Sequence, residues 1–147
     1  MIKLSSNRNK KRLSVGAFFI LAAFAYLNLQ PPQTSHSELA SLYVNKHSGQ
    51  MVEFEGQVLR ILADDNEGSR HQRFIVKSDE LTVLIAHNID LAKRVPVNIG
   101  DQVNIYGQYE YNTQGGVIHW THYDPQGKHT GGWIKHKNKK YGIGFKK

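Results

Sequence analysis

An alternation of apolar and polar side chains is the feature that most constrains how this chain folds. Val52, Phe54 and Val58 alternate with acidic and amide residues over positions 52–58, and Gly56 takes one of the apolar positions. A period of two places these apolar side chains on one face of a β-strand and leaves the other face in water. A glycine inside a strand indicates a bend or a close backbone approach. The sequence therefore predicts a half-buried strand here.

Four further segments read as strands, because each is rich in β-formers and is bounded by turn residues. The turn segments include Ala63–Ser69 (ADDNEGS) and Asn112–Gly116 (NTQGG). The predicted strands are Arg70–Lys77, Leu81–His87, Gln102–Tyr111 and Val117–Tyr123.

Two helical segments are predicted around these strands. Ser37–Lys46 (SELASLYVNK) begins with a serine cap and carries apolar residues at helical spacing, which predicts a short amphipathic helix packed on the barrel as a lid. Asn88 and Asp90 can cap a short helical segment that runs to about Arg94 and ends before Pro96.

The order of these elements predicts the fold class. Five strands with a helical turn between the third and the fourth are typical of the OB-fold, a five-stranded Greek-key barrel. We therefore expect a mainly β domain with an OB-like barrel and a short N-terminal helix. The stretch Gly100–Gly107 (GDQVNIYG) resembles the start of the fourth strand in many OB domains. Another small β-barrel or a β-sandwich is the alternative.

Several longer stretches resemble a family of small bacterial proteins of unknown function. The resemblance covers Val52 to about Tyr141, and it departs from the family pattern at Tyr123, where a second histidine is expected before Asp124 and Pro125. It implies the same domain and no established activity. The stretches are DDNEGSRHQRFI (Asp64–Ile75), AHNIDLAKRVP (Ala86–Pro96), GDQVNIYGQYEYN (Gly100–Asn112) and GGVIHWTHYDP (Gly115–Pro125), with Gly131, Gly132 and Trp133 beyond them.

The N-terminal segment reads as an export signal. Five bases lie within the first twelve residues and precede Leu13–Leu29, which has no charged residue, and Pro31 and Pro32 follow. This order is that of a signal peptide or a signal anchor, with the rest of the chain sent across the membrane. The apolar run is near the lower limit for a membrane span, so cleavage and retention both stay open. We expect a periplasmic domain, or one at the extracellular face of the inner membrane, attached through this segment if it is uncleaved.

Net charge and cysteine content exclude several function classes. The formal net charge is +7, but residues 31–134 hold 8 bases and all 12 acids, so the basic character belongs to the two ends. Nucleic acid is therefore not strongly indicated as a partner, and no partner protein is predicted. The absence of cysteine excludes disulfides and thiolate metal sites. The predicted organisation is a leader over 1–30, a linker over 31–36, the barrel over 37–134 and a basic tail over 135–147, which is either solvated or held near an anionic membrane or polymer.

The OB topology brings polar residues from distant segments to one pole of the barrel. Strands one, three and five end there and strand two begins there, so we expect their terminal residues to be neighbours. We call this set the polar rim. Its members are Asp64, Asp65, Asn66, Arg70, His71, His87, Asn88, Asp90, Thr121, His122 and Asp124.

Four interpretations of the polar rim stay open. The first is a divalent metal site for Zn²⁺, Mn²⁺ or Fe²⁺, since imidazole and carboxylate suit these ions. Its spacing signal is weak, because there is no HExxH motif and two of the histidines, at 119 and 122, fall on opposite faces of a regular strand unless a bulge intervenes. The candidate ligands are His71, His87, His119, His122, Asp65 and Asp124, with His129 as a possible fourth ligand.

The second interpretation is metal-free acid–base chemistry on a phosphoester, by a histidine beside Arg70 or Arg73. The third is a non-catalytic binding rim, and the fourth is a hydrogen-bonded network that rigidifies the barrel. We expect an extracytoplasmic domain whose rim recognises a ligand, with or without a divalent metal. A metal-assisted hydrolase is the alternative, with His71 and His122 as ligands or general base and Arg70 as an anion clamp. The candidate ligand-binding residues are Asp64, Asp65, Asn66, Arg70, Asn88 and Thr121.

Overall fold

The computed structural model describes residues 37–79 and 81–144. The chain divides between residues 35 and 36, and the fold below is that of the second unit. The predicted leader and linker lie outside the described residues. Within the described residues, no helix has both the length and the apolar character that a membrane crossing needs.

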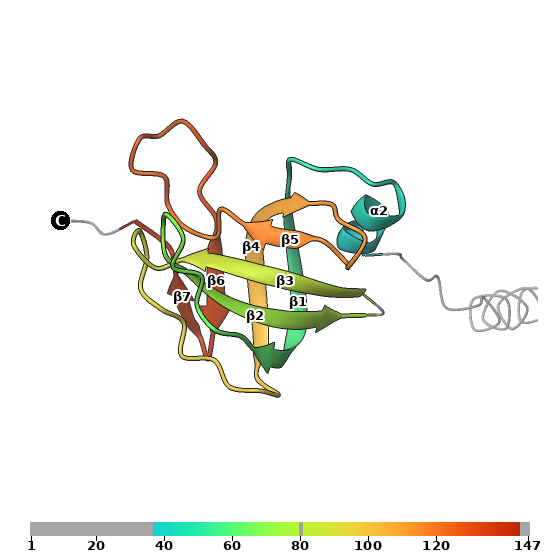
Figure 1. The fold of residues 1–147 in the computed structure, drawn as a ribbon, viewed down its shortest axis with the longest axis horizontal. Coiled ribbons are helices and arrows are strands. Elements are labelled where there is room, and N and C mark those ends of the chain that lie inside the picture. The colour runs from blue at the N-terminus through green and yellow to red at the C-terminus, as the bar shows by residue number, and fades with distance from the viewer. Residues whose placement is uncertain (1–36, 80, 145–147) are drawn as a thin grey trace, which may run out of the picture. The chain divides into compact units, whose positions relative to one another are not determined.

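Five strands close into a barrel (Figure 1). The order around it is β1-β2-β3-β5-β4, and β1 also pairs with β4, which closes the ring. Strands β3 and β5 are parallel, and the other neighbours in the ring are antiparallel. This confirms the predicted OB-like Greek-key barrel. The strands are β1 (Gln50–Ile61), β2 (His71–Ser78), β3 (Leu81–Asn88), β4 (Gln102–Glu110) and β5 (Val117–His119).

The barrel interior holds the apolar positions of the alternating pattern. In β1 the buried side chains are those of Val52, Phe54 and Val58, and the glutamates between them are exposed. Gly56 lies against β2, where a β-carbon would collide with the Val76 side chain and the Lys77 carbonyl. The close backbone approach inferred from this glycine is therefore confirmed.

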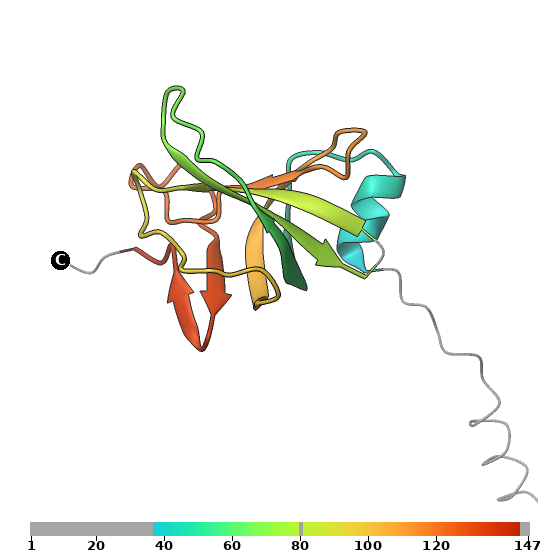
Figure 2. The same cartoon turned by 60° about the horizontal axis from the view of Figure 1, so that its bottom comes forward.

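The short helix α2 (Glu38–Val44) packs against the barrel beside β1 (Figures 1 and 2). The Ser37 hydroxyl accepts a hydrogen bond from the Ala40 amide at 3.2 Å, which caps the first turn. Leu39 and Leu42 are buried and belong to the same apolar core as the strands. The predicted amphipathic helix is confirmed, and it lies at the end of the barrel away from the polar rim.

The predicted helical segment after β3 is a single turn. Asn88 Oδ1 accepts hydrogen bonds from the amides of Asp90 and Leu91 at 2.9 and 3.1 Å, and residues 93–98 have no regular structure. The helical turn does not continue, because Val95 is buried in the core. The side-chain amide of Gln72 bonds both the carbonyl and the amide of Val95, at 2.8 and 2.9 Å.

Strand β5 is shorter than predicted, and its end is at Trp120. This residue has a φ of 52°, in the left-handed region that a bulky side chain rarely adopts. The pairing therefore stops at His119, and the predicted Val117–Tyr123 strand is wrong beyond that point. In a regular strand the side chains of residues 119 and 122 would point to opposite faces of the sheet. Because the strand ends before the turn at Trp120, this rule does not apply to the two histidines.

The basic C-terminal segment is not a tail over its first seven residues. β6 (Trp133–His136) pairs with β4, and β7 (Lys139–Tyr141) pairs with β6. Because β5 covers only Gln108–Glu110 of β4, the edge of β4 over residues 103–106 is free to accept β6. Ile134 is fully buried in the core, which anchors the hairpin. The barrel boundary predicted at residue 134 is therefore wrong, and the domain includes this hairpin (Figure 2).

Candidate functional site

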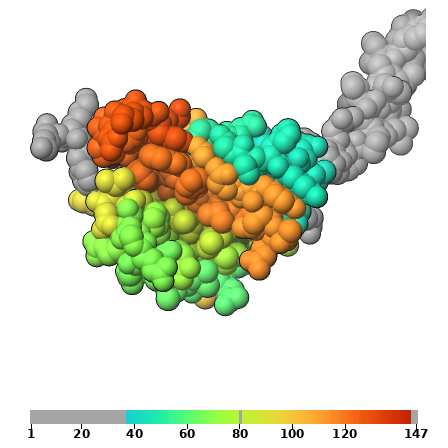
Figure 3. Space-filling model, turned by 45° about the horizontal axis from the view of Figure 1, so that its top comes forward, coloured from blue at the N-terminus to red at the C-terminus, as the bar shows by residue number. Residues whose placement is uncertain are grey.

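The polar rim forms as the topology predicts. In the space-filling view the segments around residues 64–70, 88–94 and 121–131 meet on one surface (Figure 3). Asp65 and His71 form an isolated antiparallel bridge, with backbone hydrogen bonds of 3.0 and 2.8 Å. His87 and Thr121 join the end of β3 to the loop after β5. Segments separated by more than fifty residues in sequence are thus neighbours in the fold.

His87 and Thr121 are fully buried and bonded to each other. His87 Nε2 lies 3.2 Å from the Lys93 carbonyl and must donate to it, so Nδ1 accepts from the Thr121 hydroxyl at 2.8 Å. The pKa of His87 is lowered from 6.5 to about 4, chiefly by burial and in smaller part by the charges of the nearby histidines at 122 and 71. Both ring nitrogens are therefore occupied, and His87 has no lone pair free for a ligand.

Two ion pairs join loops across the rim. Arg70 binds Asp90 twice, through its backbone amide at 2.7 Å and its Nε at 2.8 Å, and these hydrogen bonds lower the pKa of the Asp90 carboxyl. Arg94 Nη2 donates to Asp64 Oδ2. All four side chains are at least one quarter exposed, so each pair contributes little stability. Their main effect is to hold the loops together.

Three other predicted site residues act as turn formers. Asn88 accepts the amides described above, and Asp65 Oδ1 accepts the Glu67 amide at 3.0 Å. The Asp124 carboxylate accepts hydrogen bonds from the backbone amides of Gln126, Lys128 and His129. These hydrogen bonds lower the pKa of the carboxyl, and the one from Gln126 has the largest effect. Asn66 is exposed on the first loop.

His71 and His122 are the rim imidazoles that keep free ring nitrogens. His122 Nδ1 donates to the Tyr123 carbonyl at 2.8 Å, which leaves Nε2 without a hydrogen bond in the described part of the chain. The His71 ring has no hydrogen-bond partner there either. Burial lowers the pKa of His122, and His71 is close enough for its charge to lower it further. The two imidazoles are therefore close enough for the charge of one to act on the other.

His119 lies on the outer face of β5, and its charge also lowers the pKa of His122. Its Nε2 is 3.5 Å from Glu110 Oε1, and both side chains are more than one third exposed. Trp120 stacks on His129 with ring centroids 3.9 Å apart and planes at 7°. His129 Nε2 in turn bonds the side-chain oxygen of Gln108. These contacts hold the loop after β5 against β4.

The predicted metal ligands do not form a cluster. Over residues 37–79 and 81–144, no group of three or more histidine, aspartate or glutamate side chains is arranged to hold a metal ion. The physical reasons are local: both nitrogens of His87 are bonded, and the Asp124 oxygens face backbone amides. The described side chains therefore do not form the metal site that the sequence predicted.

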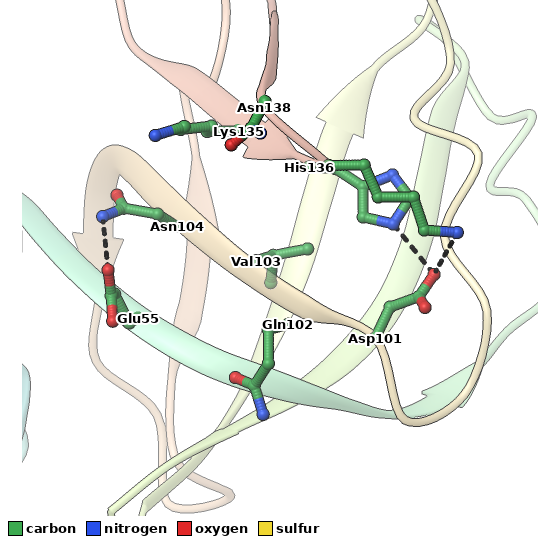
Figure 4. Close-up of a pocket in the computed structure, with 9 residues that line it drawn as sticks. Glu55, Asp101, Gln102, Val103, Asn104, Lys135, His136 and Asn138 are labelled. Atoms are coloured by element: carbon green, nitrogen blue, oxygen red, sulfur yellow. Dashed lines mark hydrogen bonds and ion pairs between the residues drawn. The ribbon is translucent and has the colours of Figure 1, made fainter.

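A groove of about 530 Å³ lies outside the rim, between β4 and the β6–β7 hairpin (Figure 4). On one side His136 Nε2 donates to Asp101 Oδ2 at 2.8 Å, and Lys137 Nζ is 3.8 Å from the same oxygen. On the other side Asn104 Nδ2 donates to Glu55 at 3.2 Å. Sequence reasoning missed this groove because it assigned 135–147 to a tail. The signal that could have revealed it was the apolar Ile134 beside His136.

Comparison with protein families gives a match over most of the chain. The family model described as "Protein of unknown function (DUF3465)" matches residues 20–142. The chain belongs to the DUF3465 family. None of the curated proteins compared with the chain matches it. The DUF3465 match extends through β7, which supports including the hairpin in the domain.

Proposed function

We propose that this protein is an exported OB-fold domain that binds an anionic group of a ligand at the polar rim, without covalent chemistry. The observation that carries the proposal is the pair of imidazoles at His71 and His122. Each keeps a ring nitrogen without a hydrogen bond among the described residues, and the charge of His71 acts on His122. Polar groups on loops held by a rigid sheet are where binding sites usually occur.

The balance of hydrogen-bonding groups at the rim favours an anion. The carboxylates of Asp64, Asp90 and Asp124 already accept hydrogen bonds from protein donors. Arg70 binds Asp90 through Nε, so its two terminal nitrogens stay available on a side chain that is 58% exposed. A bound anion would offset the mutual repulsion of protonated imidazoles, as any nearby opposite charge does. Binding should therefore strengthen as the pH falls.

Titration of residues 36–147 with inorganic phosphate, followed by NMR of the histidine ring protons, tests this proposal. This fragment is a compact unit with its own core. We expect the His71 and His122 signals to shift on addition of phosphate. The variants His71→Ala and Arg70→Gln should each weaken binding, whereas His47→Ala, an exposed histidine near α2, should not. Shifts spread evenly over all histidines would contradict a site at the rim.

A divalent metal at the rim, and the metal-assisted hydrolase that depends on it, are tested with the same fragment. Elemental analysis and thermal melts with and without a chelator are the measurements. Because the described residues do not gather a ligand set, we expect no bound metal and an unchanged melting temperature. A stoichiometric metal with a melting temperature that falls on chelation would favour the hydrolase over simple anion binding.

Export is supported by the leader sequence alone. A fusion of residues 1–36 to a reporter that is active only outside the cytoplasm should give activity. Replacing the five leading bases with glutamine should reduce that activity, because the basic segment orients the apolar run. Mass spectrometry of the mature chain decides between a cleaved signal and an anchor.

A further inference from the structure

The β6–β7 hairpin concentrates positive charge at one place on the domain. Lys135, Lys137, Lys139 and Lys140 are exposed and lie within six residues. The turn between the strands is tight, since Lys137 and Asn138 both have positive φ angles of 47° and 64°. Two consecutive residues in this region define the turn that suits a two-residue hairpin. The four ammonium groups are therefore carried by a fixed element, which projects from the barrel in Figure 2.

Hollows flank the hairpin on both sides. The groove of Figure 4 is lined by Lys135 and Lys137. A second hollow of about 290 Å³ lies between the loop at Lys93 and the strand β7, and Lys139 and Lys140 line it. Ile143, with 57% of its surface exposed, lines the same hollow. An apolar side chain thus lies among the bases.

Protection of a sheet edge does not account for this charge. Lysines on an edge strand discourage pairing with another chain, and β7 is the last strand of its sheet. That reason covers Lys139 and Lys140. It does not apply to Lys135, because β6 is paired on both sides, nor to Lys137, which lies in the turn. Lys137 forms an ion pair with Asp101, so Lys135 is the lysine of the hairpin that neither reason covers.

We propose that the β6–β7 hairpin is a docking surface for an anionic phospholipid bilayer. A projecting basic tip can reach the headgroups of a flat surface, where each lysine adds to the attraction. A nucleic acid fits less well, because Glu55 and Asp101 lie in the groove that a phosphodiester chain would follow. The proposal needs no ligand at the rim, although the hollow beside β7 is bordered by Ala92 and Lys93 of the rim loop.

Co-sedimentation of residues 36–147 with lipid vesicles tests this docking surface, since the fragment lacks the leader. The probes are vesicles of phosphatidylcholine alone and vesicles in which about one third is phosphatidylglycerol. The hairpin variant replaces Lys135, Lys137, Lys139 and Lys140 with glutamine. The control variant replaces four exposed bases elsewhere, Lys46, Arg60, Lys77 and Lys128, with glutamine and loses the same charge.

We expect binding only to the anionic vesicles, at least a 100-fold weaker affinity for the hairpin variant, and less than a 10-fold change for the control. Thermal melts establish that each variant is folded. Equal losses in the hairpin and control variants would overturn the proposal, as would equal binding to neutral vesicles. Tighter binding to a single-stranded oligonucleotide than to anionic vesicles at the same salt would also overturn it.

Discussion

His87 and Thr121 meet inside the domain, with Nδ1 of one and Oγ1 of the other 2.8 Å apart and both side chains fully buried. This bond joins the end of β3 to the loop that follows β5. It places a titratable group in the interior at the centre of the polar rim. Stability should therefore depend on the protonation of a single side chain.

Lowering the pH should destabilise the domain through His87. Its pKa is about 4 in the folded state and 6.5 in the unfolded chain, so between these values only the unfolded chain takes up the proton. This contribution is fully present above pH 6.5 and falls by about 2 kcal/mol at pH 5. Urea unfolding at pH 7.5 and pH 5 measures the loss. The His87→Gln variant should show a smaller difference, and an equal difference would assign the pH dependence to other groups.

Thr121→Val should destabilise the domain, because it leaves Nδ1 of His87 buried without a donor. The expected loss is about 1–3 kcal/mol of unfolding free energy. Thr121→Ser keeps the hydroxyl and removes only a methyl group, so it should lose less. Urea unfolding at pH 7.5 compares the two variants. If the serine variant were the less stable one, packing rather than the hydrogen bond would be the main role of Thr121.

Gly132→Ala should weaken the attachment of the hairpin to the barrel. A β-carbon at Gly132 would collide with the carbonyl oxygens of Tyr106 and Trp120, which are backbone atoms that cannot turn aside. Overpacking of this kind costs about 3 kcal/mol. Gly131→Ala is the matched control, since its nearest atom would be the Tyr123 α-carbon at 3.1 Å. Thermal melts and hydrogen exchange of the β6 amides measure the effect, and similar melts for the two variants would contradict it.

Asp124→Ala should loosen the loop between Trp120 and Trp133. The carboxylate accepts three backbone amides, at 126, 128 and 129, and alanine leaves all three without that partner. We expect faster proteolytic cleavage within this loop and little change in the far-ultraviolet circular dichroism of the barrel. Because the pKa of Asp124 is lowered, the wild-type loop should also become more cleavable in acid, as the carboxylate protonates. An unchanged cleavage rate in Asp124→Ala would show that stacking of Trp120 on His129 is sufficient.

Much of the candidate site followed from the sequence. The topology implied by the predicted strands brings the end of β3 beside the loop after β5, where His87 bonds Thr121. The topology does not show which imidazoles keep a ring nitrogen without a hydrogen bond. That depends on partners such as the Lys93 carbonyl, which lies in an irregular loop. The sequence also could not show that the Asp124 carboxylate accepts hydrogen bonds from backbone amides, which leaves its oxygens less able to bind a metal ion.

The sequence by itself determined the order of the barrel strands and which face of β1 is buried, because the period of two is a local property. Turn residues such as Asn88 were equally local, since their side chains bond amides two and three residues away. Tertiary structure alone decided that residues 133–141 join the sheet. The free edge of β4 exists only because β5 stops at His119, and that length depends on the left-handed turn at Trp120. The lysine-rich segment joins the sheet because β4 offers a free edge and the core has room for Ile134. Neither property can be predicted from the sequence of the segment alone.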